Sequence, residues 1–503
     1  MFERRDVWKL TEDSEEYPWH PIIEWYARAV MAMQGRDGTA LPPDDFVPSD
    51  PTSWRYLAEI HGTFLSQSGW PSGATWNECQ HFTWFFLPWH RIYLHYFECV
   101  VRQTIKDLGG PDDWALPYWD YSDASRPNVR KLPPAFREPR MPSGDPNPLS
   151  GDPNPLFVTQ RASVINQGGE MDATDVEIGP AMAETFFTGP APTVGFGGPA
   201  TAWSHVGNVM GSLEREPHGT VHGEVGGDGP PELSWMSWFE RAARDPIFWL
   251  HHANIDRLWE VWLAVEDHMN PTGSRWDPWL NTWFKVGGGE SAVTLRVREV
   301  LDTTQPPLNY FYSNISLPAP ARAAVLAARP VTESRFAEEE PVPEENIPPE
   351  MVGTSETGVP LAAEPTEVEV AIEAPSGPAL RERAEGAQPR QVYLQVENVR
   401  GRELAAPNYR VYVNLPPGAD PSEYEDRRIG QVSMFGVREA SRSDEEHSGS
   451  GLTFSFDITG VVERLEEAGE WAPERLRVTF APVRPSAEQG GDVSVGGVSL
   501  FYG

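Results

Sequence analysis

The chain has 503 residues, enough for two domains, and carries 74 acidic against 40 basic side chains, a net charge of −34. This charge argues against nucleic acid and anionic membranes as partners. No stretch approaches the roughly 20 apolar residues of a membrane span, and two cysteines, Cys79 and Cys99, are too few for a disulfide scaffold.

Residues 1–316 are expected to form one aromatic, helical domain. The first residues, MFERRDVWKLTEDSEE, have arginines but no apolar stretch behind them, so we expect no signal peptide and, by default, a cytoplasmic location. In SWRYLAEIHGTFL, FLPWHRIYLHYFECVVRQTI and DPIFWLHHANIDRLWEVWLAV the apolar residues return every three or four positions. These patterns predict an α-helical bundle.

Residues 317–389 are expected to form an acidic, Pro/Glu-rich linker. Between Phe336 and Leu380 there are eleven glutamates and no Lys, Arg, Trp or Tyr. Such a composition cannot bury enough apolar surface to offset its ordering entropy, and its charges repel one another. We therefore expect this segment to be extended and open to proteases.

Residues 390–503 change to alternation with a period of two, in QVYLQVENV, YRVYVNL, LTFSFDITGV, LRVTFAPV and VGGVSLFY. Alternating runs separated by turn residues predict strands, and their number predicts a small antiparallel β-sandwich or barrel. The fold class is therefore mainly α, with a helical-bundle domain followed by this β-domain.

The later histidines form a motif suited to a metal. His218 and His222 are four residues apart, so on a helix they lie on one face, although this spacing alone also suits packing. His251 and His252 are adjacent and point about 100° apart on a helix, so at most one joins the same metal. Three neutral imidazoles with an open position suit a redox copper ion.

An earlier set repeats this design. His61 closes the helical stretch SWRYLAEIH, and His81 and His90 lie in CQHFTWFFLPWHR. Because nine residues on one helix would leave two side chains on opposite faces, we expect His81 in a loop or first turn and His90 inside the next helix, with Pro88 near its beginning. The remaining histidines without a motif are read as surface or core residues: His20, His95, His205, His268 and His447.

The stretches HGTFLSQ, CQHFTWFFLPWHRIYLHYFE, LPYWDY, LEREPHGTVH and RDPIFWLHHANIDRLW follow one another as in tyrosinases and catechol oxidases, the type-3 dicopper proteins, which molluscan haemocyanin units also resemble. LNYFYSN, at 308–314, resembles the tyrosine motif that closes the family's catalytic domain. The β-rich tail resembles, more loosely, the C-terminal shielding domain of plant polyphenol oxidases.

This resemblance implies two copper ions, O2 as co-substrate and oxidation of o-diphenols to o-quinones. It assigns the first copper to His61, His81 and His90 and the second to His218, His222 and His252. His251 is the member of the pair that the family does not use as a ligand. The implied partners are a small phenolic substrate, a copper-delivery protein and an activating protease.

Cys79 lies two residues before His81, the spacing at which fungal tyrosinases and molluscan haemocyanins join the sulfur to the imidazole as a thioether. Such a bond would fix a ligand on irregular backbone. The alternatives are a buried thiol or a disulfide with Cys99, which we otherwise expect to be buried and inert.

Three residues are expected to tune the pocket by the same resemblance. Glu214 matches a plant glutamate that holds water near the second copper and assists phenol deprotonation, although an acidic helix cap is the plainer reading. Gly219 stands where strong monophenol hydroxylases often carry Asn, which predicts weak or absent hydroxylation. Phe239 matches a gate over the first copper, with an ordinary core Phe as the alternative.

Other motif residues are read as structural support. Asp256 and Arg257 are expected to pair with each other, Trp119 and Asp120 to pack beneath the site, and Glu98 to contact a ligand imidazole from outside.

The tail predicts a latent enzyme that is activated by cleavage within residues 336–390, with Met434 and Phe435, in the exposed stretch QVSMFGVRE, as an apolar plug. An independent module is the alternative. Other functions that fit the motifs are a tyrosinase with full monophenolase activity, an o-aminophenol oxidase and, in another class, a haemocyanin-like oxygen carrier.

Overall fold

The computed structural model describes residues 1–13, 19–39, 41–142, 151–189, 191–201, 207–328, 349–356, 358–373, 391–401, 407–443, 449–472, 474–484 and 492–503. The chain divides into two compact units. Unit 1 comprises Met1–Ile178 and Glu216–Pro318, and unit 2 comprises Gly179–Arg215 and Ala319–Gly503. His205 and His447 lie outside the described residues.

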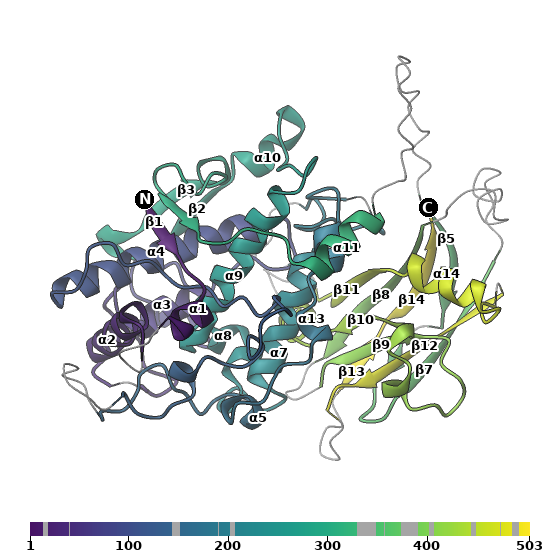
Figure 1. Ribbon diagram of the computed structural model, residues 1–503, viewed down its shortest axis with the longest axis horizontal. Coiled ribbons are helices and arrows are strands. Elements are labelled where there is room, and N and C mark those ends of the chain that lie inside the picture. Colours follow the sequence, from purple (N-terminus) through teal and green to yellow (C-terminus); the bar gives the residue numbers. More distant parts are fainter. Residues whose placement is uncertain are drawn as a thin grey trace. The chain divides into compact units, whose positions relative to one another are not determined.

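Unit 1 is mainly helical (Figure 1). Its helices are α1 (Val7–Glu12), α2 (Pro21–Arg36), α3 (Trp54–His61), α4 (Phe86–Asp107), α5 (Ser163–Asn166), α7 (Thr220–Gly226), α8 (Phe239–Ala242), α9 (Pro246–Leu263) and α10 (Asp277–Leu280). Two small sheets accompany them, formed by β1 (Phe2–Arg4) with β4 (Tyr310–Tyr312) and by β2 (Trp283–Val286) with β3 (Val293–Arg296).

The helices that carry the histidines begin and end at residues suited to those places. Ser53 caps α3 by accepting from the amide of Tyr56 at 3.3 Å, and α3 ends at His61. Asp245 caps α9 by accepting from Ile247 N at 3.0 Å, with Pro246 in the first helical position. His81 precedes α4, whose third residue is Pro88, as the sequence predicts.

Helices α4 and α9 pack together in the core of unit 1, where the rings of Phe97 and Trp249 stack with centroids 3.5 Å apart. A buried ionic cluster joins the same helices: Asp256 of α9 accepts from Arg91 Nε of α4 at 2.5 Å. Arg4 of β1 and the hydroxyls of Tyr310 and Tyr312 of β4 also donate to Asp256.

Three expectations about this region are wrong. Asp256 does not pair with Arg257, because neighbouring helical side chains diverge; the Arg257 guanidinium lies 2.8 Å from Asp120 instead. Glu98 faces Arg4 and the amide of Leu116 rather than a histidine. Cys99 is exposed, because it lies on the solvent side of α4, and no disulfide joins it to the buried Cys79.

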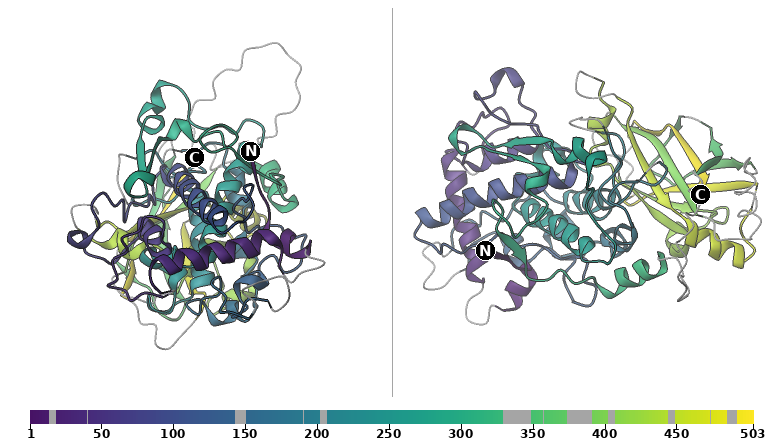
Figure 2. Two further views of the ribbon diagram at one scale, coloured as in Figure 1. Left: turned by 90° about the vertical axis from the view of Figure 1, so that its left-hand side faces the viewer. Right: turned by 90° about the horizontal axis from the view of Figure 1, so that it is seen from above.

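Unit 2 is built on an antiparallel sheet (Figures 1 and 2). Its strands pair in the order β10-β9-β12-β7-β5-β14-β8-β13-β6, and β11 pairs with β8. The strands are β5 (Glu350–Ser355), β6 (Val359–Pro360), β7 (Thr366–Ile372), β8 (Val392–Gly401), β9 (Tyr409–Val413), β10 (Arg428–Val432), β11 (Leu452–Asp457), β12 (Arg475–Pro482), β13 (Val493–Val495) and β14 (Gly497–Tyr502). Helices α6 (Gly179–Ala183), α11 (Ala319–Ala328), α13 (Val437–Ser441) and α14 (Thr459–Glu467) complete it.

The expected linker is partly folded, which corrects the boundaries 317–389. Residues 319–328 form α11, and 350–372 supply three strands, two of them inside the sheet. In β7 the valines Val368 and Val370 are buried while Glu367 and Glu369, which alternate with them, face outward. The alternation of valine and glutamate therefore lets an acidic segment form a strand with one buried face, which the composition alone does not reveal. Residues 329–348 and 374–390 lie outside the described residues.

Residues 179–215 also belong to unit 2, although they come from the middle of the expected catalytic domain. Thr453 N of β11 donates to Asn208 O at 2.7 Å, and the guanidinium of Arg215 donates to Ser455 O and lies over the Phe456 ring at 4.6 Å. Among the described residues, no helix is both long and apolar enough to cross a membrane.

Candidate metal centre

The three earlier histidines converge in unit 1. His61 ends α3, His81 lies in the loop before α4, and His90 is inside α4. Their ligating nitrogens all lie within 4.8 Å of one another, and all three side chains are buried. The ring centroids of His61 and His81 are 5.2 Å apart, and those of His81 and His90 are 4.9 Å apart. The structure thus gathers the set that the sequence assigns to the first metal.

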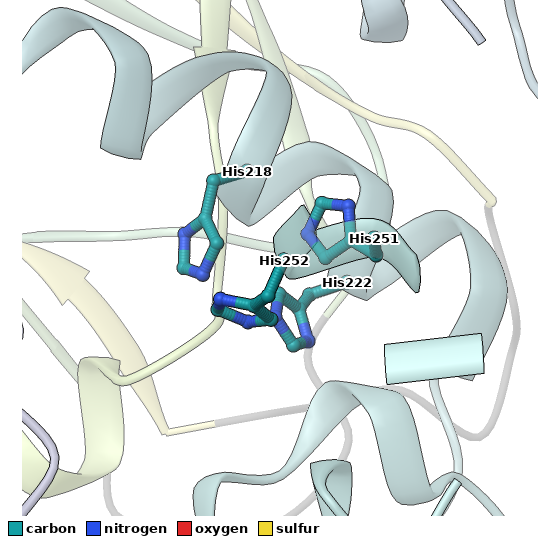
Figure 3. Close-up of side chains that lie close together, drawn as sticks. All are labelled: His218, His222, His251 and His252. Atoms are coloured by element: carbon teal, nitrogen blue, oxygen red, sulfur yellow. The ribbon is translucent and has the colours of Figure 1, made fainter. Parts of the chain in front are cut away.

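The later histidines form a second buried group, drawn in Figure 3. His218 lies in the irregular turn η4 (Glu214–Gly219), which contains Pro217, and His222 lies in α7; their ring centroids are 4.7 Å apart. Both His251 and His252, from α9, have a ligating nitrogen within 4.8 Å of the others. Which of these two completes the ligand set therefore stays a prediction, in favour of His252.

The two groups are neighbours. The rings of His90 and His252 stack at 14° with centroids 4.6 Å apart, and those of His81 and His218 are 5.7 Å apart. Histidines of one group thus lie against histidines of the other in the buried interior of unit 1, so metals bound by the two groups would be neighbours.

Backbone carbonyls orient three of these rings. His61 Nδ1 lies 2.9 Å from Phe239 O, His90 Nδ1 lies 2.9 Å from Phe86 O, and His222 Nδ1 lies 2.6 Å from Met236 O. Because a carbonyl only accepts, each Nδ1 carries the proton and each Nε2 keeps its lone pair. His251 differs, since its Nδ1 faces the hydroxyl of Tyr121 at 3.0 Å.

Burial keeps these imidazoles neutral. It lowers the pKa of His61 to about 4, with the hydrogen bond to Phe239 opposing it, and it lowers the pKa of His251 to about 3. Burial, followed by the neighbouring histidines, holds the pKa values of His81 and His252 well below the usual range. Neutral imidazole is the form that binds metals.

The donor set fits a pair of metal ions. His61 Nε2 and His90 Nε2 are buried without a hydrogen-bond partner, an arrangement that is costly unless a cation takes the lone pairs. His222 Nε2 and His252 Nε2 lie 3.2 Å apart, close to the separation of two nitrogens that share one metal at about 2 Å. An all-imidazole site without carboxylates suits copper better than a hard cation.

Comparisons with known proteins identify this centre. The family described as "Common central domain of tyrosinase" matches residues 51–265. Tyrosinase HcTyr1 from Hahella sp. (strain CCB-MM4) is 32% identical, over 99% of this chain and 99% of its own length. The chain belongs to the tyrosinase family. Its histidine groups are accordingly those of a dicopper protein, and this tyrosinase-family chain is a type-3 copper enzyme that oxidises phenols, with O2 as co-substrate.

Other relatives extend the similarity to unit 2. A chloroplastic polyphenol oxidase from Malus domestica is 24% identical over 95% of this chain and 74% of its own length. The solved structure of a latent aurone synthase (polyphenol oxidase) covers 99% of this chain and 89% of its own, with a TM-score of 0.61 and 21% identity. That of latent apple tyrosinase has a TM-score of 0.59 and 22% identity, and covers 100% of this chain and 97% of its own. A family described as a domain of unknown function matches residues 348–503. The similar structures show that the whole fold, sheet included, is shared.

The pocket residues expected from the sequence lie as follows. The Phe239 ring lies against His81, with centroids 4.3 Å apart, and also near His61, at 5.9 Å; both belong to the first group. Glu214 and Gly219 are buried at the two ends of η4. Cys79 is buried. The thioether with His81 stays a prediction, and a peptide two hydrogen atoms lighter than its sequence requires would confirm it.

The expected plug is less open than predicted. Phe435 is 2% exposed and Met434 is half-buried, so the stretch around them is not an exposed loop. Burial of the Phe435 ring is favourable because it removes apolar surface from water. Met434 Cε would lie 3.6 Å from a Cβ on Gly401, which places it beside β8. Their role as a plug stays a prediction.

Sequence reasoning missed the groups that orient the ligands. The carbonyls of Phe86, Met236 and Phe239 have no side-chain signature, so no motif points to them. Tyr121 lies in the stretch LPYWDY, and its hydroxyl could have marked it as a hydrogen-bonding residue.

Proposed function

We propose that this chain oxidises o-diphenols to o-quinones, with weak or no hydroxylation of monophenols, and that its C-terminal unit keeps it latent until that unit is removed. Each diphenol gives up two electrons and two protons, and one O2 takes the electrons and protons of two diphenols to form two waters. The copper pair supplies this two-electron redox chemistry; the protein binds and orients the phenol and keeps bulk water out.

Gly219 is the observation that carries the preference for diphenols. It stands directly after His218 and has no side chain to hold a water that would deprotonate a monophenol. Its φ of −66° and ψ of −34° are open to any residue, so the backbone does not require glycine there. The buried carboxylate of Glu214 is then the group that takes the phenol proton through water, without an amide to assist it.

Aromatic rings support the binding of a flat substrate. Phe239 lies over His81 and stacks with Phe82 at a centroid distance of 5.8 Å, so a phenol ring that enters above the first group meets an aromatic face. A small phenolic substrate is therefore proposed, together with a copper-delivery protein and an activating protease as partners.

Oxygen uptake tests the proposal. The copper-loaded chain is assayed on catechol and on tyrosine before and after limited proteolysis. Catechol turnover that rises once cleavage has led to release of the C-terminal unit, with little turnover of tyrosine, supports a latent diphenol oxidase. The two solved structures of similar fold, the aurone synthase and the apple tyrosinase, are of latent forms, which supports this expectation. Turnover of tyrosine as fast as that of catechol would favour the full tyrosinase, and reversible O2 binding without turnover would favour an oxygen carrier.

The variant Gly219→Asn tests the role of this position, with Gly219→Ala as the matched control. The Asn amide supplies the missing donor, so the ratio of tyrosine to catechol turnover should rise about tenfold or more. Alanine adds bulk without an amide and should leave the ratio near that of the wild type. Equal ratios in both variants would show that Gly219 does not set the preference for diphenols.

A further inference from the structure

A short segment contacts both histidine groups. Residues 235–240, which we call the strap, comprise the turn η5 (Trp235–Ser237) and the first residues of α8. Met236 O accepts from His222 of the second group at 2.6 Å, and Phe239 O accepts from His61 of the first group at 2.9 Å. Two carbonyls three residues apart therefore fix one ligand of each metal.

The strap passes close to both helices that carry these ligands, and each helix has a glycine at the crossing. Gly62 directly follows His61 at the end of α3; a Cβ there would lie 2.7 Å from Phe239 O and 2.8 Å from Phe239 C. Gly226 ends α7, which carries His222; a Cβ there would lie 2.4 Å from Ser237 N and 3.0 Å from Met236 C. At Gly226 the side-chain Oγ of Ser237 is also in the way, but at both glycines backbone atoms of the strap lie too close, so an added methyl group would displace the strap itself.

Other contacts hold the strap in place. Ser237 Oγ donates to Gly227 O at 2.6 Å, and Trp235 N donates to Gln160 O at 3.0 Å. Trp54, the first residue of α3, donates from Nε1 to Arg244 O at 3.0 Å, just beyond α8. The strap thus has fixed ends, and its distance from the two histidines is set by what the glycines allow.

We propose that the strap is a single positioning element for both metals, and that Gly62 and Gly226 are positioning residues for the first and second metal respectively. The carbonyls hold His61 and His222 in the tautomer that presents Nε2, and the glycines allow the close approach that those hydrogen bonds need. The inference rests on the dicopper assignment and not on the preference for diphenols, because its test measures bound copper.

The experiment compares Gly62→Ala and Gly226→Ala with Gly35→Ala. Gly35 lies in α2, where a Cβ would meet nothing within 4 Å, so the control adds the same methyl group without moving the strap. Each chain is loaded with copper, and copper per chain and its release to a chelator are measured. Loss of a hydrogen bond that orients a ligand should speed release from one site by roughly 10- to 100-fold. Gly62→Ala should speed release most from the first site and Gly226→Ala most from the second, and the double variant should speed release strongly from both.

The thermal midpoint of each metal-free variant serves as the folding control. Folded variants that keep two coppers with wild-type release rates would overturn the proposal. If either variant fails to fold, histidine ¹⁵N spectra of the metal-free wild-type chain decide instead. His61 and His222 should carry the proton on Nδ1; a proton on Nε2 in either ring would overturn the proposal.

Discussion

Carbonyl groups orient ligands without adding charge to the pocket. A carboxylate beside His61 or His222 would raise the pKa of the ring and favour imidazolium, whereas the carbonyls of Phe239 and Met236 leave burial as the dominant effect. The rings therefore remain neutral well below physiological pH, ready to bind copper. The same burial lowers the free energy of unfolding in acid, because a histidine in the unfolded chain binds a proton at a pH at which the buried ring does not.

His95 allows this linkage to be measured outside both metal groups. Burial lowers its pKa to about 4, with Glu98 opposing and Arg4 and Arg102 adding to the decrease. The unfolded chain binds the extra proton between the folded value and the ordinary one near 6.5, so the stability that neutral His95 provides is complete above that value and is lost as the pH falls towards 4. Going from pH 7 to pH 5 should cost the wild type about 2 kcal/mol more than it costs His95→Gln.

Urea unfolding of the two metal-free chains at both pH values measures this difference. The other histidines titrate alike in both chains and cancel in the comparison. Equal losses of stability in the two chains would show that His95 is protonated in the folded state.

At the scale of elements, the buried ionic cluster fixes how α4 and α9 sit against each other, and these helices carry His90 and His252. Asp256 joins Arg91 of α4 to Arg4 of β1 and to the tyrosines of β4. The cluster thus ties both ends of unit 1 to the two ligand helices.

Asp256→Ala should destabilise the chain by about 3–5 kcal/mol, because it leaves two buried guanidinium groups without their shared carboxylate. Asp112→Ala is the control. Asp112 pairs with Lys106 on the surface, with side chains 79% and 62% exposed, and should change the free energy of unfolding by no more than about 1 kcal/mol. Urea unfolding of the metal-free chains measures both, and similar small losses would mean that the cluster relaxes around the missing group.

The ligand groups could be predicted from the sequence, whereas the ion-pair partners and strand β7 could not. The histidine motifs, together with the family resemblance, predicted both ligand groups, whereas spacing alone placed only His218 and His222 on one face of a helix. The Asp256–Arg257 pair failed because adjacency in sequence is not adjacency in space, and the true partners, Arg91 and Asp120, are remote in sequence. Strand β7 was missed because its glutamates dominated the composition while its alternating valines decided the structure.

At the scale of the whole chain, unit 2 includes two segments that precede residues 374–390 in the sequence. Residues 179–215 lie within the stretch that matches the tyrosinase central domain, yet they bond to β11 through Asn208 and Arg215. Strands β5 and β7 precede residues 374–390 but lie inside the sheet, paired with β14 and β12. A cut in 374–390 would therefore sever the chain while the sheet still joins its two fragments.

Cleavage should for this reason not by itself release the C-terminal fragment. A protease site inserted within 374–390 leaves β5 and β7 on the N-terminal fragment, held by the sheet and by the contacts of 179–215 with β11. A site within 329–348 leaves β5 and β7 on the C-terminal fragment, so the sheet no longer joins the fragments, while the contacts of 179–215 with β11 remain. We expect both cut proteins to elute as one species in native size-exclusion chromatography, and the second to separate at a lower urea concentration.

Catechol turnover measured on the same fractions should rise where the fragments separate, rather than when the chain is cut. Wild-type chain treated with the same protease is the control for cleavage elsewhere. A C-terminal fragment that elutes alone after the 374–390 cut, without denaturant, would mean that the sheet and the β11 contacts are too weak to hold it. Activation would then follow directly from cleavage, and the rate of the protease would set the rate of activation.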